Sequence, residues 1–332
     1  MNQATLTGSP GVIAALQNRF AAESMALVYR FALILLIALA LATLTEGFSA
    51  TNNILNVLRQ ASLIFLLAAG LTLVILSGGF DLSVAANLTL SACLAAGVMK
   101  SGGSPLLGAS VAIACGASVG LLNGLAVTLL RLPPFLATYG MLWILQGLAF
   151  HYMGGNEIYG FLPEFRALGT GFFLGVPIPV YLMVAVLIAC TVLTHGLNYG
   201  RELYAIGANP VAARLSGIPV LKRQIMVYII SGLTAGVAAL VYLARVNAAD
   251  SGIGEPLLLP AIAAVLIGGT SLFGGVGSLF RTVLGAIILA MVINGMNLLN
   301  VHSTWQPLVV GVVLLAAVLL DLIGGGRRER IG

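Results

Sequence analysis

Runs of apolar residues, separated by short polar or glycine-rich stretches, fill almost the whole chain. A helix needs about 20 mostly apolar residues to cross a bilayer, and roughly ten runs approach that length. The pattern therefore predicts an all-α, polytopic membrane protein. The expected spans are residues 27–46, 60–78, 83–100, 105–130, 135–152, 177–196, 223–244, 257–273, 280–298 and 305–323. A chain of eight spans, with re-entrant segments around Gly78 or Gly274, fits the same pattern.

A single membrane domain accounts for almost the whole chain. Its longest polar loops, at 153–176 and 197–222, are far shorter than a folded domain of about 50 residues or more. The segment before the first apolar run is longer than the basic region of a signal peptide, so we expect it to be retained. The expected parts are a cytoplasmic N-terminal segment (1–26), a transmembrane domain (27–323) that includes the loop 197–222, and a basic cytoplasmic tail (324–332).

Arginine and lysine are distributed unevenly between the loops of this topology. Cytoplasmic loops of membrane proteins carry an excess of these residues, so we place both termini in the cytoplasm. The cytoplasmic side then holds Arg19, Arg30, Arg131, Arg201, Arg214, Lys222, Arg223, Arg281, Arg327, Arg328 and Arg330. The opposite side holds Arg59, Lys100, Arg166 and Arg245. An even number of spans satisfies this orientation.

The composition agrees with a membrane protein and excludes a soluble one. The 332 residues are 60% hydrophobic and 8% charged, with a mean hydropathy of +1.08. A soluble domain has about 25% charged residues, so this chain has too few to cover a surface that faces water. The net charge of +5 is not gathered into a large basic patch. We interpret it as a signal of topology and expect a lipid bilayer, and no nucleic acid, as partner.

The motifs of nucleotide-binding and metal-dependent catalytic proteins are absent from the sequence. The phosphate-binding loop GxxxxGK[ST] needs a lysine after a glycine, and neither Lys100 nor Lys222 follows one. No HExxH and no metal-spaced histidine cluster occurs either. We therefore expect that this chain is not an enzyme and holds no metal and no cofactor.

Carboxylates within the predicted spans are also scarce, since only Asp81 and Glu255 fall close to membrane depth. A carrier driven by protons or sodium ions usually has several charged or ion-coordinating groups in its spans. Their scarcity indicates that the energy for transport comes from a partner protein. A stand-alone secondary transporter of a small polar solute is the alternative function. A membrane-embedded enzyme is disfavoured by the missing motifs.

The loop GRELYAIGANPVAARLSGI, residues 200–218, has the clearest local signal outside the spans. Asn209 is a favourable N-cap and Pro210 suits the first position of a helix, so a short helix is predicted here. Gly217 suits a left-handed stop at the C-terminal end of that helix. The helix connects the sixth and seventh predicted spans.

This short helix is either an ordinary interfacial helix or a lever that docks on a partner protein. Ala212 and Ala213 have small side chains, which allow a helix to lie deep in a groove of another protein. Arg214 carries a charge that can pair with a carboxylate of the partner. Only the lever interpretation gives the loop a part in transport.

Four stretches resemble the membrane permease subunit of bacterial ABC importers of the ribose, xylose and galactose type. They are ILSGGFDLSV (75–84), LNGLAVTLLRLPPFLATYGM (122–141), GRELYAIGANPVAARLSGI (200–218) and AVLIGGTSLFGGVGS (264–278). Each is weak alone, but together they are specific, and the resemblance covers the chain from residue 50 to residue 320.

The resemblance implies import of a monosaccharide or similar small polar solute across a bacterial inner membrane. It implies a homodimer of permeases, cytoplasmic ATP-binding subunits that hold the ATP and magnesium, and a periplasmic solute-binding protein. The ATP-binding subunits are often one fused tandem chain in this family. The loop 200–218 would then carry the coupling helix. The candidate coupling residues are Glu202, Asn209, Pro210, Ala212, Ala213, Arg214 and Gly217.

Asp81 stands in GGFDLS, which joins the second and third predicted spans at the cytoplasmic side. Gly78 and Gly79 can adopt backbone angles closed to other residues, so with Asp81 they form a candidate structural hinge. We expect Asp81 to act as the N-cap of the next helix rather than to bind solute. A broken backbone near the pathway is tolerated only where protein or water shields it.

Amide and aromatic side chains are the candidates for the translocation pathway, because they suit an uncharged, polyhydroxylated solute. Tyr139, Trp143 and Gln146 share one face of the fifth span. Hydrogen bonding between helices in lipid is the alternative role of the amides. The candidate pathway residues are Asn87, Asn123, Tyr139, Trp143, Gln146, Asn294 and Asn297.

Glycines form two further patterns. The stretches LSGGFDLSV (76–84) and LIGGTSLFGG (266–275) both have a GG pair followed three residues later by leucine. This echo is either an internal repeat, as in many transporters, or a coincidence of glycine-rich sequence. Glycines also recur every four positions in two spans, which predicts close approach of helices. These are Gly116, Gly120, Gly124, Gly232 and Gly236.

Overall fold

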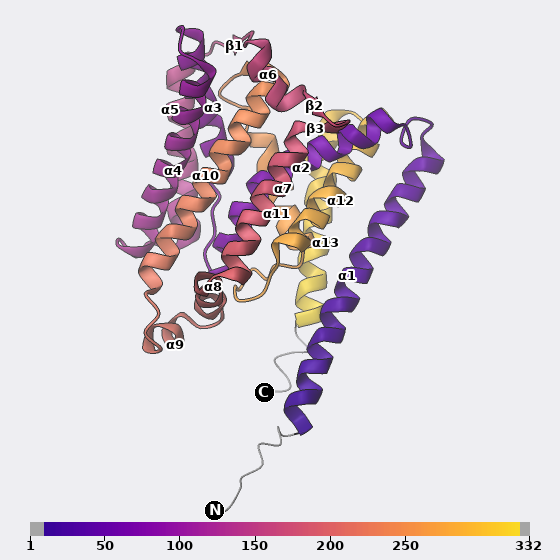
Figure 1. Cartoon of the computed structure of the whole chain (residues 1–332), viewed down its shortest axis with the longest axis vertical. Helices are drawn as coiled ribbons and strands as arrows, with labels where there is room; N and C mark the ends of the chain where they lie inside the picture. The colour runs from indigo at the N-terminus through magenta and orange to yellow at the C-terminus, as the bar shows by residue number, and fades with distance from the viewer. Residues whose placement is uncertain (1–9, 326–332) are drawn as a thin grey trace, which may run out of the picture.

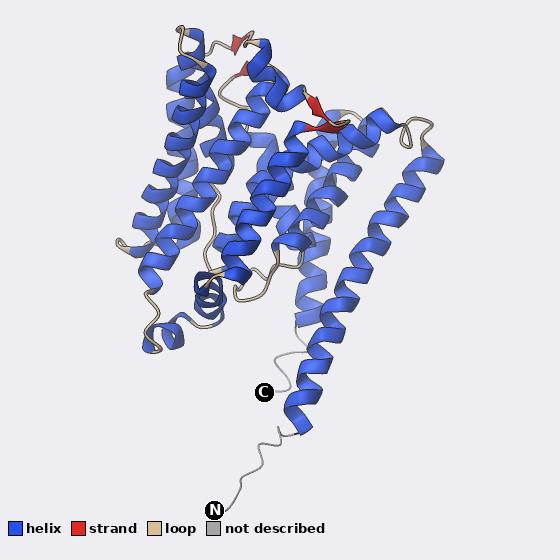
Figure 2. Cartoon of the chain, viewed as in Figure 1, coloured by secondary structure: helices blue, strands red, loops and turns tan. Residues whose placement is uncertain are grey.

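The computed structural model describes residues 10–325, which form a bundle of long helices (Figures 1 and 2). The helices are α1 (Pro10–Leu44), α2 (Thr51–Leu76), α3 (Val84–Lys100), α4 (Pro105–Thr128), α5 (Pro134–Met153), α6 (Pro163–Thr170), α7 (Ile178–Thr191), α8 (Asn198–Ala208), α9 (Pro210–Leu215), α10 (Val220–Val246), α11 (Glu255–Ile267), α12 (Leu279–Leu298) and α13 (Gln306–Gly325). A π-helical turn, η1 (Val192–Gly196), continues α7, and a 3₁₀ turn, η2 (Ser303–Trp305), precedes α13.

Two small antiparallel ribbons lie at the end of the bundle away from α8 and α9 (Figure 1). The strands are β1 (Ile158–Tyr159) with β4 (Ala248–Ala249), and β2 (Phe172–Phe173) with β3 (Val176–Pro177). In register, Ile158 lies opposite Ala249, Tyr159 opposite Ala248, Phe172 opposite Pro177 and Phe173 opposite Val176. The first ribbon ties the loop after α5 to the loop after α10.

The prediction of a helical membrane protein is confirmed. Six helices of the described chain are long and apolar enough to cross a bilayer: α1 from Leu27, α2, α4, α7 with η1, α10 and α12. The apolar helices α3, α11 and the start of α13 are shorter. Every predicted span coincides with one of these helices or with the 20-residue α5. One predicted boundary is wrong, because α11 ends at Ile267, where Gly268 and the left-handed Gly269 follow.

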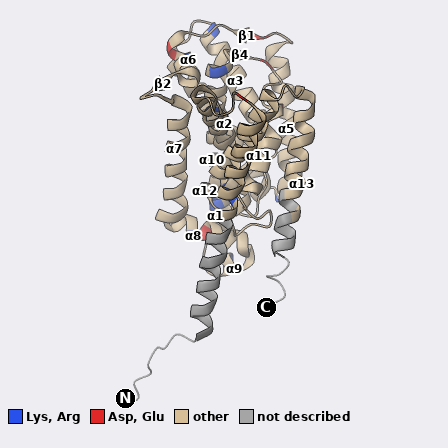
Figure 3. Ribbon diagram, turned by 90° about the vertical axis from the view of Figure 1, so that its right-hand side faces the viewer, with Lys and Arg blue, Asp and Glu red and all other residues tan. Residues whose placement is uncertain are grey.

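The two ends of the bundle differ in charge. The start of α1, the end of α13, and α8 and α9 all lie at one end, here called the termini end (Figure 1). By their positions in the helices, the basic residues assigned to the cytoplasmic side lie toward this end wherever the structure describes them, and the four assigned to the opposite side lie toward the far end. Figure 3 shows Lys and Arg in blue toward both ends of the bundle. The basic tail residues Arg327, Arg328 and Arg330 fall outside the described residues. The charge pattern thus gives the correct relative arrangement of the loops.

Glycine faces let α4 and α10 pack backbone to backbone, as the spacing predicts. A methyl group added at Gly116 would lie 2.3 Å from the Gly232 carbonyl oxygen. One added at Gly120 would lie 2.2 Å from the Tyr228 carbonyl oxygen. Beside this pair, α2 is buried along most of its length and forms the centre of the bundle. In contrast, α1 is peripheral, since only 6% of its apolar window is buried.

Two helices begin inside the bundle rather than at its surface. The chain leaves α2 at the termini end and turns back inward, so that α3 begins at Val84, which is fully buried. The start of α11 lies beside α3, because the Gly254 N–H donates to the Thr89 hydroxyl at 3.0 Å. The protein therefore has two internal helix starts, each preceded by irregular backbone that the surrounding helices shield from lipid.

Candidate coupling and translocation sites

The loop between η1 and α10 folds into an elbow made of α8 and α9 at the termini end (Figure 1). Asn209 is the N-cap of α9, since its side-chain oxygen accepts the N–H groups of Val211 and Ala212, each at 3.0 Å. Pro210 occupies the first helical position. The helix stops before Gly217, whose φ of +83° is left-handed. The predicted short helix, with its cap and its stop, is confirmed.

One side of α9 is open and the other packs inward. Ala212, Arg214 and Leu215 are exposed, and Leu215 keeps 85% of its surface. Ala213 is buried at 4% exposure, against apolar residues of α8 and α10. The expectation that both alanines face a partner is therefore corrected. Ala212 lies on the open side, whereas Ala213 holds the elbow together, because successive helical residues point about 100° apart.

An ion pair fixes the elbow to the start of α10. Glu202 of α8 pairs with Arg223, whose guanidinium lies 5.2 Å from the centre of the Tyr199 ring. The Tyr199 hydroxyl donates to the Arg223 carbonyl at 3.0 Å. Burial raises the pKa of the Tyr199 hydroxyl above its ordinary value, so the group remains a donor at neutral pH. Glu202, a predicted coupling residue, thus has its partner within this chain.

Gly207, near the end of α8, lies directly against the backbone of two distant turns. A methyl group added at Gly207 would lie 1.9 Å from the Leu76 carbonyl oxygen and 2.3 Å from the Gly275 nitrogen. The two turns are themselves bonded, since the Gly275 N–H donates to the Leu76 carbonyl at 3.0 Å. Gly78 and Gly274 meet at the same place, with φ of +77° and +86°. We call Gly78, Gly207, Gly274 and Gly275 the glycine junction.

The glycine junction brings together the two echoing stretches, 76–84 and 266–275, and attaches the elbow to both. A hydrogen bond reinforces the attachment, because the Tyr204 hydroxyl of α8 donates to the Gly277 carbonyl at 3.0 Å. A cleft of about 350 Å³ opens beside this contact. Gly207 and Tyr204 are not among the residues predicted from sequence. The available signal was a glycine within an otherwise helical stretch, which is typical of close backbone approach.

Beyond the junction, Asp81 is buried at 2% exposure in the irregular segment before α3. Its carboxylate accepts the Ser83 N–H at 3.0 Å, the Ser83 hydroxyl at 2.7 Å and the Ser231 hydroxyl of α10 at 2.9 Å. The predicted N-cap role is wrong, because the N-cap of α3 is Ser83. Asp81 instead anchors the segment to α10, which supports a structural role.

The same segment is held from two further sides. The Tyr228 hydroxyl of α10 donates to the Phe80 carbonyl at 3.2 Å, and the Leu82 N–H donates to the Thr138 hydroxyl of α5 at 3.1 Å. Gly79 is required for space rather than for backbone angle, since a methyl group there would lie 2.8 Å from the Tyr228 hydroxyl oxygen. These contacts fix the segment in the bundle between its glycine turn and α3.

Three of the predicted pathway amides hold helices together. Asn87, Asn123 and Asn294 are each at most 4% exposed. Asn87 donates to a carbonyl of α4 at 3.2 Å, Asn123 donates to the Ser83 hydroxyl at 2.7 Å, and Asn294 exchanges two hydrogen bonds with an asparagine of α2. These contacts fit the alternative role, hydrogen bonding between helices. Asn297 is exposed at the end of α12 and accepts a hydrogen bond from a glutamine of α13.

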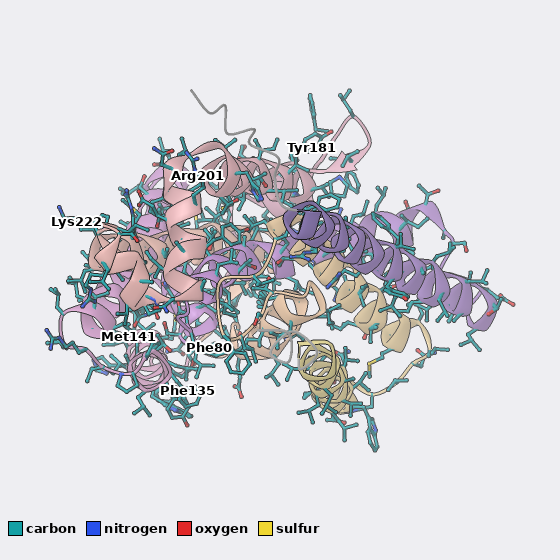
Figure 4. All side chains as sticks on the ribbon, turned by 90° about the horizontal axis from the view of Figure 1, so that it is seen from below. Phe80, Phe135, Met141, Tyr181, Arg201 and Lys222 are labelled. Carbon is teal, nitrogen blue, oxygen red and sulfur yellow. The ribbon has the colours of Figure 1, made fainter. Side chains whose placement is uncertain are left out.

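The other predicted pathway residues share an open face of α5. Tyr139 and Trp143 are 45% and 59% exposed. With Phe135 they form a ladder, in which neighbouring ring centres are 6.1 and 6.3 Å apart. Gln146, the next residue of this face, donates to the Ser251 carbonyl just before α11. Figure 4 shows Phe135, the first ring of this ladder, beside Phe80 and away from Arg201 of the elbow.

Comparisons with known proteins identify relatives along almost the whole chain. The family described as branched-chain amino acid transport system / permease component matches residues 53–318. The ribose import permease protein RbsC of Bacillus subtilis (strain 168) is 41% identical over 288 residues, 86% of this chain and 89% of that protein. RbsC of Escherichia coli (strain K12) is 42% identical over 294 residues, 87% and 91% of the two chains. The D-allose transport system permease protein AlsC of the same strain is 37% identical over 292 residues, 88% and 90%. No solved structure matches this chain.

We predict that Asp81→Asn lowers the stability of the folded protein by about 2 kcal/mol, because the amide keeps a single acceptor oxygen for three buried donors. Thermal unfolding in detergent and the yield of monodisperse protein measure the effect. Glu157→Gln makes the same chemical change at an exposed position and should leave both unchanged. Equal behaviour of the two variants would show that the Asp81 hydrogen bonds are dispensable.

Proposed function

The chain belongs to the family of branched-chain amino acid transport system permease components, and on that basis we propose that it is the membrane subunit of an ATP-driven sugar importer. The relatives support a sugar rather than an amino acid, since their names specify ribose, D-allose and L-arabinose. The substrate is a monosaccharide or a similar small polar solute. These relatives also favour an importer powered by a partner over a stand-alone secondary transporter.

The orientation follows from the charged ends of the bundle. The termini end faces the cytoplasm, because it holds most of the basic residues. Both termini, α8 and α9 then lie in the cytoplasm, and the two ribbons face the periplasm. About ten helices cross or enter the bilayer, with α3 and α11 as shorter, internally starting segments in the bacterial inner membrane.

Three kinds of protein complete the importer. A cytoplasmic ATP-binding subunit, which holds ATP and magnesium, docks on the open side of α9, and a periplasmic solute-binding protein delivers the sugar to the far end. A second copy of this chain completes the passage. The exposed side chains of α9 support the docking site, because an apolar Leu215 with 85% exposure and a charged Arg214 beside it suit a protein partner.

The coupling mechanism rests on the glycine junction. ATP binding moves the partner subunit and displaces α9, and α8 follows because the two helices form one elbow. Gly207 touches the backbone of both glycine turns, so a displaced α8 moves the end of α2 and the end of α11 together. Backbone contacts without intervening side chains have little slack, and close-packed interiors transmit strain. The motion therefore reaches the segment of Asp81 and the face of α5.

We predict that Gly207→Ala uncouples the importer. The added methyl group would force α8 away from Leu76 and Gly275, so sugar uptake into vesicles should fall about tenfold or more while the partner still hydrolyses ATP. Gly140→Ala is the matched control, since a methyl group there meets nothing within 4 Å. Tyr204→Phe provides a milder test that keeps the ring, because it removes the hydroxyl group that bonds to Gly277. Normal uptake by both Gly207→Ala and Tyr204→Phe would exclude the junction from coupling.

We predict that Arg214→Glu prevents the ATP-binding subunit from copurifying with the permease, because it reverses the charge on the open side of α9. Insertion into the membrane should stay unchanged. Lys222→Glu makes the same change at a nearby exposed position on α10 and should retain the complex. If both variants bind the subunit equally well, α9 is not the docking site.

A further inference from the structure

Glu255 is an exposed carboxylate at a helix start that lies inside the far end of the bundle. It is the first residue of α11. Gly254, just before it, is bonded to Thr89 in the second turn of α3. Ser251, four residues earlier, accepts the amide of Gln146, the thirteenth of the 20 residues of α5. The contact with Thr89 places the start of α11 inside the bundle, because Thr89 lies roughly 16 Å before the end of α3 at a rise of about 1.5 Å per residue.

A carboxylate at this depth cannot face hydrocarbon at acceptable cost. Ionisable side chains within membrane spans almost always face the bundle interior or a water-filled cavity, and they mark substrate or ion pathways. Among the side chains that the structure describes, Glu202 with Arg223 forms an ion pair, and Glu255 has no basic partner within reach. The exposed face around Glu255 is therefore not a lipid-facing surface.

The side chains of α5 nearest the turn before α11 suit a sugar. Gln146 attaches the turn before α11 to α5, and Trp143 lies one helical turn along the same helix with 59% of its surface exposed. An aromatic ring offers a flat apolar face to the C–H groups of a sugar ring, and a carboxylate is a strong acceptor for hydroxyl groups. Few convergent polar groups on an apolar wall are typical of small-molecule sites.

We propose that Glu255 lines the water-filled passage and accepts hydrogen bonds from the hydroxyl groups of the passing monosaccharide, with Trp143 as the apolar wall of the same subsite. This inference rests on the proposed import of sugar and adds a specificity-determining residue to it. The negative charge of Glu255 also disfavours anionic solutes in the passage, because like charges repel at low dielectric.

Thiol labelling tests whether Glu255 borders water. Glu255→Cys is placed in the complete importer in lipid vesicles and treated with a membrane-impermeant cationic methanethiosulfonate, without nucleotide and with ATP. The parent chain, which has Cys93, Cys115 and Cys190, provides the blank. Leu36→Cys on the peripheral α1, where Leu36 is 64% exposed, is the lipid-facing control and should not react. We expect Glu255→Cys to react in at least one state. Failure to react in every state would overturn the proposal, whether lipid or a second copy covers the site.

Contact with sugar is tested separately. A saturating monosaccharide with its binding protein should slow the labelling of Glu255→Cys, and Glu255→Gln should reduce sugar uptake about tenfold, the loss expected for one hydrogen bond to a charged group. Glu255→Asp should restore much of the uptake. Unchanged labelling with sugar, or full uptake by Glu255→Gln, would overturn the contact. If the parent importer carries no monosaccharide at all, the proposed function fails instead, and the labelling without sugar still tests the passage.

Discussion

The structure depends on a place where three backbones meet without room for a side chain. At Gly207 the last turn of α8 touches the end of α2 and the turn after α11, and these two turns are hydrogen-bonded to each other. Any larger residue would separate the elbow from the bundle. Because the contact is backbone to backbone, the elbow cannot shift without moving both turns, so this short segment is mechanically tied to α2 and α11.

The lipid environment explains why the irregular segments are so tightly held. Backbone that is not helical has unsatisfied N–H and C=O groups, which no water relieves in the bilayer core. The segment between Gly78 and α3 meets this need through Asp81, Tyr228 and Thr138, which bond it to α10 and α5. Polar residues in the spans thus have two distinct uses. Buried ones fix the breaks, and more open ones, such as the half-buried Gln146 and the exposed Glu255, are the residues that we propose to border the passage.

Local features of this chain could be predicted from its sequence, and relations between distant segments could not. The cap, the proline and the glycine stop of α9 are encoded within nine residues, and the glycine faces of α4 and α10 follow from their spacing. The direction in which Ala213 points, and the partner of Glu202, depend on how the elbow folds onto α10. The two echoing stretches were visible in the sequence, but their contact through Gly207 needs the whole fold.

The residues predicted to line the pathway fall into two groups, buried and exposed, and the sequence could not separate them for a similar reason. An asparagine in a span has the same sequence signature whether it bonds a neighbouring helix or a solute. Asn87, Asn123 and Asn294 prove to be buried between helices, whereas Tyr139 and Trp143 remain exposed. Burial is set by the packing of α3, α4 and α12, and no local pattern reports it. The bias of basic residues, by contrast, acts on whole loops, and it gave the relative arrangement of the two ends.

The most direct test of the central claim is a pair of distances measured by pulsed electron paramagnetic resonance in the reconstituted importer. Spin labels at Leu215→Cys on α9 and Phe273→Cys in the turn after α11 occupy exposed positions, 85% and 78%. A second pair, Leu215→Cys with Leu39→Cys on α1, reports whether the elbow moves at all. We predict that ATP changes the second distance and leaves the first unchanged, because elbow and turn move as one unit. An elbow that moves relative to Phe273 would contradict the account.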